Sequence, residues 1–273
     1  MVYTGMSTNR TLQLEINVQT VVIWIIFSVE FLVMSLAFYG LCCLIRTNHT
    51  VPVFVINLFI TDFIQICFRP VLNFCTFSVV IAFIYYIYSW CIIVNVGFMV
   101  CISVERYIMI KYPVWYRLHN TSKNLALICL LVWAIPSGII VGHAFILSVF
   151  VLLMPYPLVL FSFVGSWKAL SNSVAITPDE QKRILRILAL VLFNYTVLFL
   201  PSIIQNIIIM FSFELGLRCH GYLLTVSGIL VYLNPLADSL LYVFLRKDAN
   251  SMFPCLCCEN DIEIDAALAY LAY

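Results

Sequence analysis

The chain has 273 residues, of which 64% are hydrophobic and only 10% are charged, and its mean hydropathy is +1.06. This composition excludes a water-soluble domain of the same length, because so apolar a chain could not keep its surface in water. The formal net charge of +1, without a basic patch, argues against a nucleic acid partner. We therefore expect a membrane protein whose backbone polar groups are satisfied within helices.

Six apolar runs follow one another along the chain. They cover residues 21 to 45, 51 to 68, 71 to 104, 125 to 167, 187 to 213 and 219 to 245. Each supplies the roughly 20 residues that a membrane-spanning helix needs, the second only marginally. The fourth run has 43 residues, which as one helix would measure roughly 65 Å, twice the hydrocarbon thickness. It therefore predicts two antiparallel helices, with the turn near residues 138 to 143.

The basic residues indicate how the helices cross the membrane. Basic clusters lie on both sides of the fourth run, at residues 106 to 123 and 168 to 186. Since both clusters favour the cytoplasm, an even number of crossings separates them, and the total becomes seven. The predicted fold is an all-α seven-transmembrane helix bundle at residues 21 to 245 in the plasma membrane. An extracellular amino terminus (residues 1 to 20) and a cytoplasmic tail with a short amphipathic helix (residues 246 to 273) flank it.

Both flanking segments carry candidate modification sites. Asn9 begins an Asn-Arg-Thr sequon on the predicted outer side, so Asn9 is the expected glycosylation site. The tail carries Cys255, Cys257 and Cys258 after a basic turn, a pattern typical of an interfacial amphipathic helix with acylated cysteines. The alternative is that these cysteines are free cytosolic thiols.

Polar residues interrupt the apolar runs, where a charge costs on the order of 3 kcal/mol or more. They are Glu30, Asp62, Asn95, Asn234 and Asp238. The carboxylates of Asp62 and Asp238 could coexist there if a cation, water or a shared proton relieved their repulsion. Carboxylate and amide oxygens suit a small alkali or alkaline-earth cation. The alternative is that each acid is protonated and binds a neighbouring helix, without an ion. Glu30 has no matching partner in its own helix and is expected to be a packing or interface residue.

Pro155 and Pro201 fall inside predicted helices. A proline there removes a backbone hydrogen bond and bends the helix, so each is a candidate hinge. A static kink is the alternative interpretation.

Short motifs occur at characteristic places on the predicted helices, and Glu105-Arg106-Tyr107 ends the third of them. This triplet resembles the Asp/Glu-Arg-Tyr motif that rhodopsin-like G-protein-coupled receptors, a family of membrane proteins, carry at the same place. Further family positions follow in the same order, namely Asn57 and Asp62 on helix two, Trp133 on helix four, Pro155 on helix five, Phe199 and Pro201 on helix six, and Asp238 and Tyr242 on helix seven. With phenylalanine at position 199 and aspartate at position 238, the chain is most similar to the branch of the family that contains nucleotide, lipid and proton-sensing receptors.

The resemblance implies a role for each matching residue. An allosteric sodium ion, the only cofactor implied, would bind Asp62, Asn95 and Asp238 in a water-containing pocket that includes Asn234. Arg106 would be held by Glu105 at rest and would line a G-protein cavity when helix six swings outward at Pro201. The other implied switch residues are Tyr107, Phe199 and Tyr242. Pro155, Val96 and Tyr195 would occupy the positions of a connector beneath the ligand site.

The chain also departs from the family pattern. Ser239 replaces the helix-seven proline, Phe163 replaces a tyrosine of helix five, and Ile81 replaces the cysteine at the outer end of helix three. Trp133 and Pro155 are only 22 residues apart, which leaves almost no room for the second extracellular loop. We therefore expect that this loop is largely deleted.

The favoured function is a receptor that passes an extracellular small-molecule, lipid or peptide signal to a heterotrimeric G protein. The residues expected to contact the ligand are Arg69, Tyr85, Tyr88 and Phe199. Membrane lipids are further expected partners. The alternatives are that Arg69 snorkels to the interface and that the tyrosines only pack. A non-signalling decoy or truncated receptor is a second hypothesis, and an ion transporter or channel is a remote third. The histidines are too scattered for a shared zinc site, so we do not expect an enzyme.

Overall fold

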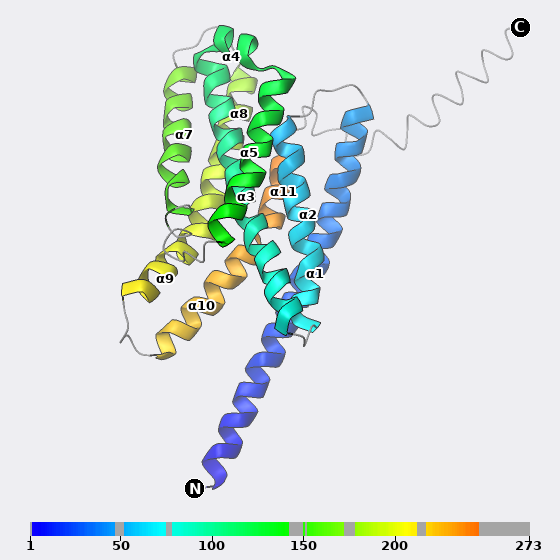
Figure 1. The fold of residues 1–273 in the computed structure, drawn as a ribbon, viewed down its shortest axis with the longest axis vertical. Coiled ribbons are helices and arrows are strands. Elements are labelled where there is room, and N and C mark those ends of the chain that lie inside the picture. Colours follow the sequence, from blue (N-terminus) through cyan, green and yellow to red (C-terminus); the bar gives the residue numbers. More distant parts are fainter. Residues whose placement is uncertain are drawn as a thin grey trace, which may run out of the picture.

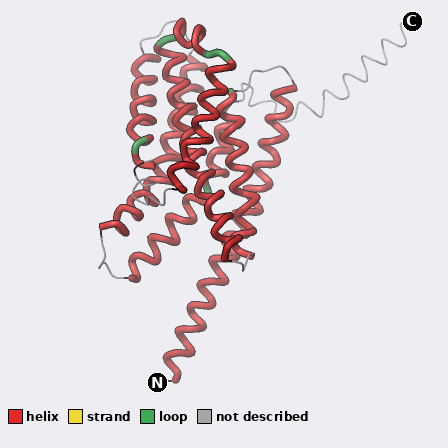
Figure 2. Tube along the Cα trace, viewed as in Figure 1, coloured by secondary structure: helices red, strands yellow, loops and turns green. Residues whose placement is uncertain are grey.

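A computed structural model describes residues 2–46, 52–74, 78–141, 150, 152–171, 178–211 and 217–245 of the chain. Within these ranges the elements are helices joined by short turns, and none is a strand (Figure 1, Figure 2). In chain order they are α1 (Val2–Arg46), α2 (Val53–Phe74), α3 (Ser78–Lys111), α4 (Pro113–His119), α5 (Ser122–Val141), α7 (Pro155–Ser171), α8 (Pro178–Asn194), the π-helical turn η1 (Tyr195–Phe199), α9 (Leu200–Phe211), α10 (Leu217–Tyr232) and α11 (Asn234–Leu245).

Four helical stretches in the described ranges are long and apolar enough to cross a bilayer. They are Thr20–Cys42, Val53–Val71, Ser78–Lys111 and Gln181–Ile208, the last of which passes through α8, η1 and α9. A fifth is present if α4 and residues Ser122–Ser137 form one span broken by an 84° bend, and Thr225–Leu241 is a shorter apolar helix. The outer faces expose large apolar side chains, as a lipid environment requires. The chain is therefore an all-α membrane protein, which confirms the predicted fold class.

The described helices follow the order of the predicted crossings. The expectation that residues 125 to 167 form two helices is confirmed, because α5 ends at Val141 and α7 begins at Pro155. The predicted start of the turn, at residue 138, is wrong, because α5 continues through Gly138 to Val141. One glycine costs a helix only about 1 kcal/mol, which the surrounding apolar residues offset. Residues 142 to 149 lie outside the described ranges.

α3 is the central helix of the bundle and packs against α2, α5, α7 and α8 (Figure 1). Its residues Val96 and Phe98 join Tyr195, Phe199 and other buried side chains in the largest hydrophobic cluster. α3 approaches α5 closely, since a β-carbon at Gly97 would lie 2.8 Å from Val132 Cγ1.

The first helix is longer than a membrane span. α1 has 45 residues and measures about 68 Å at the α-helical rise. It begins at Val2, so the segment predicted as the extracellular amino terminus continues the first span as helix. Between residues 20 and 42 only Glu30 and Met34 are buried, so α1 touches the bundle along a narrow stripe.

The two predicted hinge prolines occupy different places in their helices. Pro155 begins α7 and directly follows a helical turn, in which the Met154 N–H bonds to the Phe150 carbonyl. The helical run is interrupted at Met154, because proline has no N–H to continue the hydrogen bonds and fits the first turn of a new helix. Pro201 lies in α9 directly after η1, where the Leu200 N–H bonds to the Tyr195 carbonyl five residues earlier. Because proline lacks an N–H and crowds the preceding turn, the wide turn accommodates it without breaking the span.

Candidate functional site

Buried polar side chains meet between α2, α3, α8 and α11, and we call Asp62, Asn95, Asn194, Asn234 and Asp238 the central polar cluster. The Asn95 amide donates to Asp62 Oδ1 at 2.6 Å and to Asp238 Oδ2 at 3.2 Å, so one amide bridges both carboxylates. Asn234 donates to the same Asp238 oxygen at 3.1 Å. Asn194 donates to Asp238 Oδ1 at 3.0 Å. All five side chains are 0% to 1% exposed.

Three amide oxygens of the central polar cluster lack a hydrogen-bond partner among the described residues. They are the Oδ1 atoms of Asn95, Asn194 and Asn234. A buried polar atom without a partner costs about 1–3 kcal/mol. Oxygens of amides and carboxylates are the ligands that small hard cations prefer, so the donor set fits a sodium ion. No group of three or more His, Cys, Asp or Glu side chains able to hold a metal occurs in the part of the chain searched.

Helix geometry explains how distant positions reach this point. Asn234 and Asp238 are four residues apart on α11 and therefore lie on one face. The chain breaks between α10 and α11 at Leu233, just before Pro235, so Asn234 begins a new helix beside the carboxylates. Asn194 was not assigned to the polar pocket from the sequence, since Asn194-Tyr195-Thr196 was read only as a glycosylation motif inside an apolar run. A buried amide in an apolar run is the signal that could have identified it.

A second buried polar group joins α1, α2, α3 and α10. The Arg69 guanidinium forms an ion pair with Glu30 and donates to the Tyr232 carbonyl at 2.9 Å. Its Cζ atom lies 4.7 Å from the centre of the Tyr232 ring, against which Tyr88 packs edge to face at 6.1 Å. Arg69 is 1% exposed, so the snorkelling alternative is wrong. Glu30 has an ionic partner on α2, so its interpretation as a packing or interface residue is also wrong.

The other residues predicted for a ligand cavity do not all join this group. Tyr88 is buried, whereas Tyr85 on the same helix is 64% exposed. Phe199 lies deeper, in the main hydrophobic cluster, with its ring 5.7 Å from that of Tyr195. The Tyr195 hydroxyl donates to the Leu152 carbonyl just before α7. Val96 and Tyr195 share this cluster, as the resemblance implies, and α7 contributes Val159 and Tyr156 to it.

Two motif residues on neighbouring helices are in direct contact. The Trp133 indole N–H donates to Asn57 Oδ1 at 3.0 Å, which links α5 to α2. The Trp90 indole of α3 packs on Trp133 at 5.1 Å and donates to its carbonyl at 3.2 Å. The three helices are therefore connected by polar contacts as well as by packing.

The Glu105-Arg106-Tyr107 triplet has a different arrangement from the expected one. Glu105 Oε1 accepts a hydrogen bond from the Tyr116 hydroxyl of α4 at 2.8 Å. Arg106 instead lies with its Nη1 3.9 Å from Met109 Sδ. The expected pairing of Arg106 with Glu105 is wrong for this structure, since the ion pair found among the described residues is Glu30 with Arg69. The helix α4 supplies a competing donor, which the sequence alone does not place beside Glu105.

Tyr107 points toward α7 and packs closely there. A β-carbon at Gly165 would lie 2.5 Å from the Tyr107 ring, so the glycine makes room for it. Phe161 packs edge to face on the same ring at 5.4 Å, and the Lys111 amine donates to its hydroxyl at 2.7 Å. Several predicted sites lie outside the described residues or have side chains that are not described, namely Asn9, Tyr242, Cys255, Cys257 and Cys258.

Comparison with known proteins supports the resemblance. The chain is 25% identical over 97 residues to the human Mas-related G-protein coupled receptor member X1, a match that covers 34% of this chain and 30% of that receptor. It is 26% identical over 129 residues to the human lysophosphatidic acid receptor 4, covering 43% of this chain and 34% of the receptor. The chain is thus similar in sequence to G-protein-coupled receptors.

A short segment is more closely similar. Over 37 residues, 14% of this chain, it is 46% identical to the human proto-oncogene Mas, of which 11% is covered. The matches to these receptors therefore each span about a third of their length or less. No protein-family model matches the chain.

Proposed function

We propose that the chain is a rhodopsin-like receptor that transduces an extracellular ligand signal to a heterotrimeric G protein at the plasma membrane. The observation that carries the proposal is the central polar cluster, in which Asn95 joins Asp62 of α2 to Asp238 of α11. Buried charges inside a membrane bundle are costly and mark function. The similarity to G-protein-coupled receptors supports the same conclusion. The proposed orientation has the amino terminus outside and the carboxyl tail in the cytoplasm, as the basic residues indicate.

We further propose that the central polar cluster holds a sodium ion. The carboxylates of Asp62 and Asp238 and the amide oxygen of Asn95 would coordinate it, and Asn194 and Asn234 offer further oxygens that lack partners. A bound cation would supply the positive charge that lets two carboxylates remain ionised in one buried site. Without it, the same side chains could be held by a shared proton.

The proposed hinge lies on the outer side of this cluster, and the segment that it moves, α8, runs from the cluster to the cytoplasmic end. Asn194 ends α8, and the π-helical turn and Pro201 follow directly. A wide turn next to a proline is a position where a span can bend with little loss of hydrogen bonding. A movement there would displace Asn194 from Asp238 and carry α8 away from α3. Arg106, which has no ion-pair partner among the described residues, would then face the opened cavity.

The test is agonist-independent G-protein activation in cells that express the chain with an amino-terminal surface tag. We expect basal signalling that Arg106→Ala abolishes at equal surface level. Lys168→Ala is the matched control, because Lys168 is an exposed cation in the last turn of α7. Equal signalling by Arg106→Ala and the unchanged chain, or surface expression without any signalling, would contradict the proposed coupling.

A further inference from the structure

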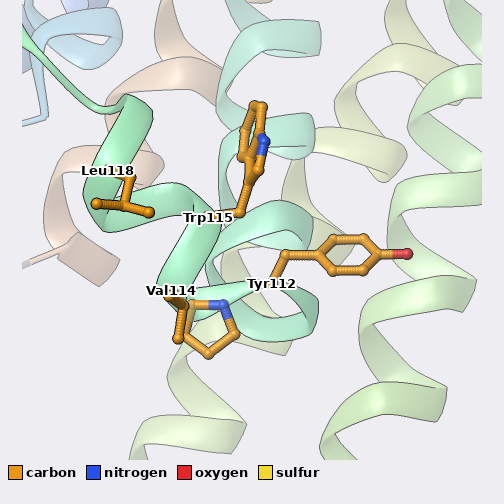
Figure 3. A pocket seen from close by; sticks show the side chains of 5 residues that line it. Tyr112, Val114, Trp115 and Leu118 are labelled. Carbon is orange, nitrogen blue, oxygen red and sulfur yellow. The ribbon is translucent and has the colours of Figure 1, made fainter.

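The short helix α4 presents an apolar face that no other described element covers. None of its residues is buried. Val114 and Leu118 lie one turn apart and are 71% and 70% exposed, and Tyr112 and Trp115 are half exposed. These side chains and Pro113 line a shallow hollow of about 450 Å³, shown in Figure 3. Exposed apolar side chains that gather on one face indicate a surface that a partner or a membrane covers.

The position of α4 limits what that partner can be. The helix begins two residues after the end of α3 at Lys111 and ends three residues before α5 begins at Ser122. Its axis makes an angle of 84° with Ser122–Ser137, so α4 lies nearly perpendicular to a membrane-crossing helix. On the side toward α3, the hydrogen bond from Tyr116 to Glu105 fixes its rotation. The helix is thus held in the plane where α3 ends and α5 begins, which is the bilayer surface.

The exposed charges of α4 and of the residues that flank it are positive. Between Glu105 and Asp179 the sequence contains no acidic residue, while it contains Arg106, Lys111, Arg117, Lys123 and Lys168. Arg117 and Lys123 are exposed beside the apolar face. Trp115 stacks on His119 with 4.3 Å between the ring centres, an amphipathic pair of the kind that favours the headgroup region.

We propose that α4 is an interfacial anchor that docks on acidic phospholipids. Tyr112, Val114, Trp115 and Leu118 would insert at the boundary between headgroups and acyl chains, and Arg117 and Lys123 would bind the anionic headgroups. Leu127 and Leu130 of α5, the next helix in the chain, are also exposed. A basic surface and an apolar face on one short helix are complementary to an acidic leaflet. This inference does not depend on signalling.

The experiment measures the environment of Trp115 in the full chain reconstituted in nanodiscs. The chain has five tryptophans, so the emission of Trp115 is taken as the difference between the unchanged chain and Trp115→Phe. Lipids brominated near the headgroup should quench the emission of Trp115 strongly, and aqueous acrylamide should quench it weakly. Trp167, 59% exposed on α7, is a lipid-facing reference measured in the same way with Trp167→Phe.

The lipid preference is tested by placing the bromine either on phosphatidylserine or on phosphatidylcholine in mixed nanodiscs. Phosphatidylserine should be enriched several-fold near Trp115, and Arg117→Gln with Lys123→Gln should remove this enrichment, since each cation contributes up to about fivefold. Strong quenching by acrylamide without quenching by lipid would overturn the proposal and leave the face for a protein partner. Equal quenching by the two bromolipids would overturn the acidic headgroup. If Trp115→Phe does not fold, a photo-cross-linker at residue 118 decides by the presence or absence of lipid adducts.

Discussion

The Tyr116 hydroxyl donates to Glu105 Oε1 at 2.8 Å, so the carboxylate beside Arg106 is bonded to α4. Burial and the hydrogen bond to Glu105 raise the pKa of Tyr116 to about 12. The neutral phenol is therefore favoured in the folded protein. The stability that this pKa shift contributes is fully present below the ordinary tyrosine pKa of about 10. It is lost only as the pH rises through the raised pKa of Tyr116 in the folded protein. Tyr116 consequently remains a donor to Glu105 throughout the physiological range.

Tyr116→Phe should reduce stability by about 1 kcal/mol, because it removes a donor from a half-buried carboxylate. The value is below the usual range of about 1.5–3 kcal/mol for hydrogen bonds to charged groups, since Tyr116 is partly exposed and water replaces part of the loss. Thermal unfolding in nanodiscs measures the change. Tyr85→Phe is the control, because that ring is 64% exposed on α3. Identical unfolding temperatures for the two variants would contradict the role of the contact.

Gly97→Ala should destabilise the contact between α3 and α5. The added methyl would lie 2.8 Å from Val132 Cγ1, and a valine side chain in a helix has little freedom to move away. Overpacking of this kind costs about 1–3 kcal/mol, more than the gain in helix propensity of about 1 kcal/mol. Gly40→Ala has nothing within 4 Å of its new methyl and should be neutral or stabilising.

Removing the neighbour tests whether steric overlap is the cause. The double variant Gly97→Ala with Val132→Ala should unfold closer to Val132→Ala than the sum of the two single changes predicts. Thermal unfolding of the purified chain gives all four values. If the stability changes of the two single variants add up to that of the double variant, the methyl group at position 97 does not act through Val132.

Arg69→Gln and Glu30→Gln should each be severely destabilising, by about 3–5 kcal/mol, because each leaves one charge buried without its ionic partner. The double variant, which is neutral at both positions, should lose much less than the sum. Surface expression and thermal unfolding in a double-mutant cycle measure the coupling. A coupling energy near zero would mean that water or lipid headgroups reach the pair and screen it.

Sodium should stabilise the purified chain if the central polar cluster binds it. At a concentration ten times the dissociation constant the gain is about 1.4 kcal/mol relative to a bulky organic cation. Asp62→Asn should abolish the dependence of the unfolding temperature on sodium, whereas the double variant Glu30→Gln with Arg69→Gln, in the other polar group, should leave it intact. If the unchanged chain shows no dependence on sodium, a shared proton and not an ion holds Asp62 and Asp238 together.

The sequence predicts the helical class and the meeting of Asp62 with Asp238, because the cost of burying polar groups in lipid leaves few alternatives. It does not predict the pairing of Glu30 with Arg69. That contact depends on the rotation of α1 and α2 about their axes, and α1 is apolar on nearly all sides. The contact of Glu105 with Tyr116 was missed for a similar reason, since it requires the position of α4. The interruption of the helical run before Pro155 could be predicted, because proline cannot continue the hydrogen bonds of a helix.

The π-helical turn at Tyr195–Phe199 also determines the directions in which the side chains of the following helix, α9, point. A wide turn contains one residue more than an α-helical turn, and one residue corresponds to about 100° of rotation. Every side chain of α9 is therefore rotated by about that angle from its position on an uninterrupted helix. With this rotation, Gln205 of α9 accepts a hydrogen bond from the Ser227 hydroxyl of α10. Deleting one residue from the turn would direct Gln205 away from Ser227 and present a different row of α9 side chains to the neighbouring helix.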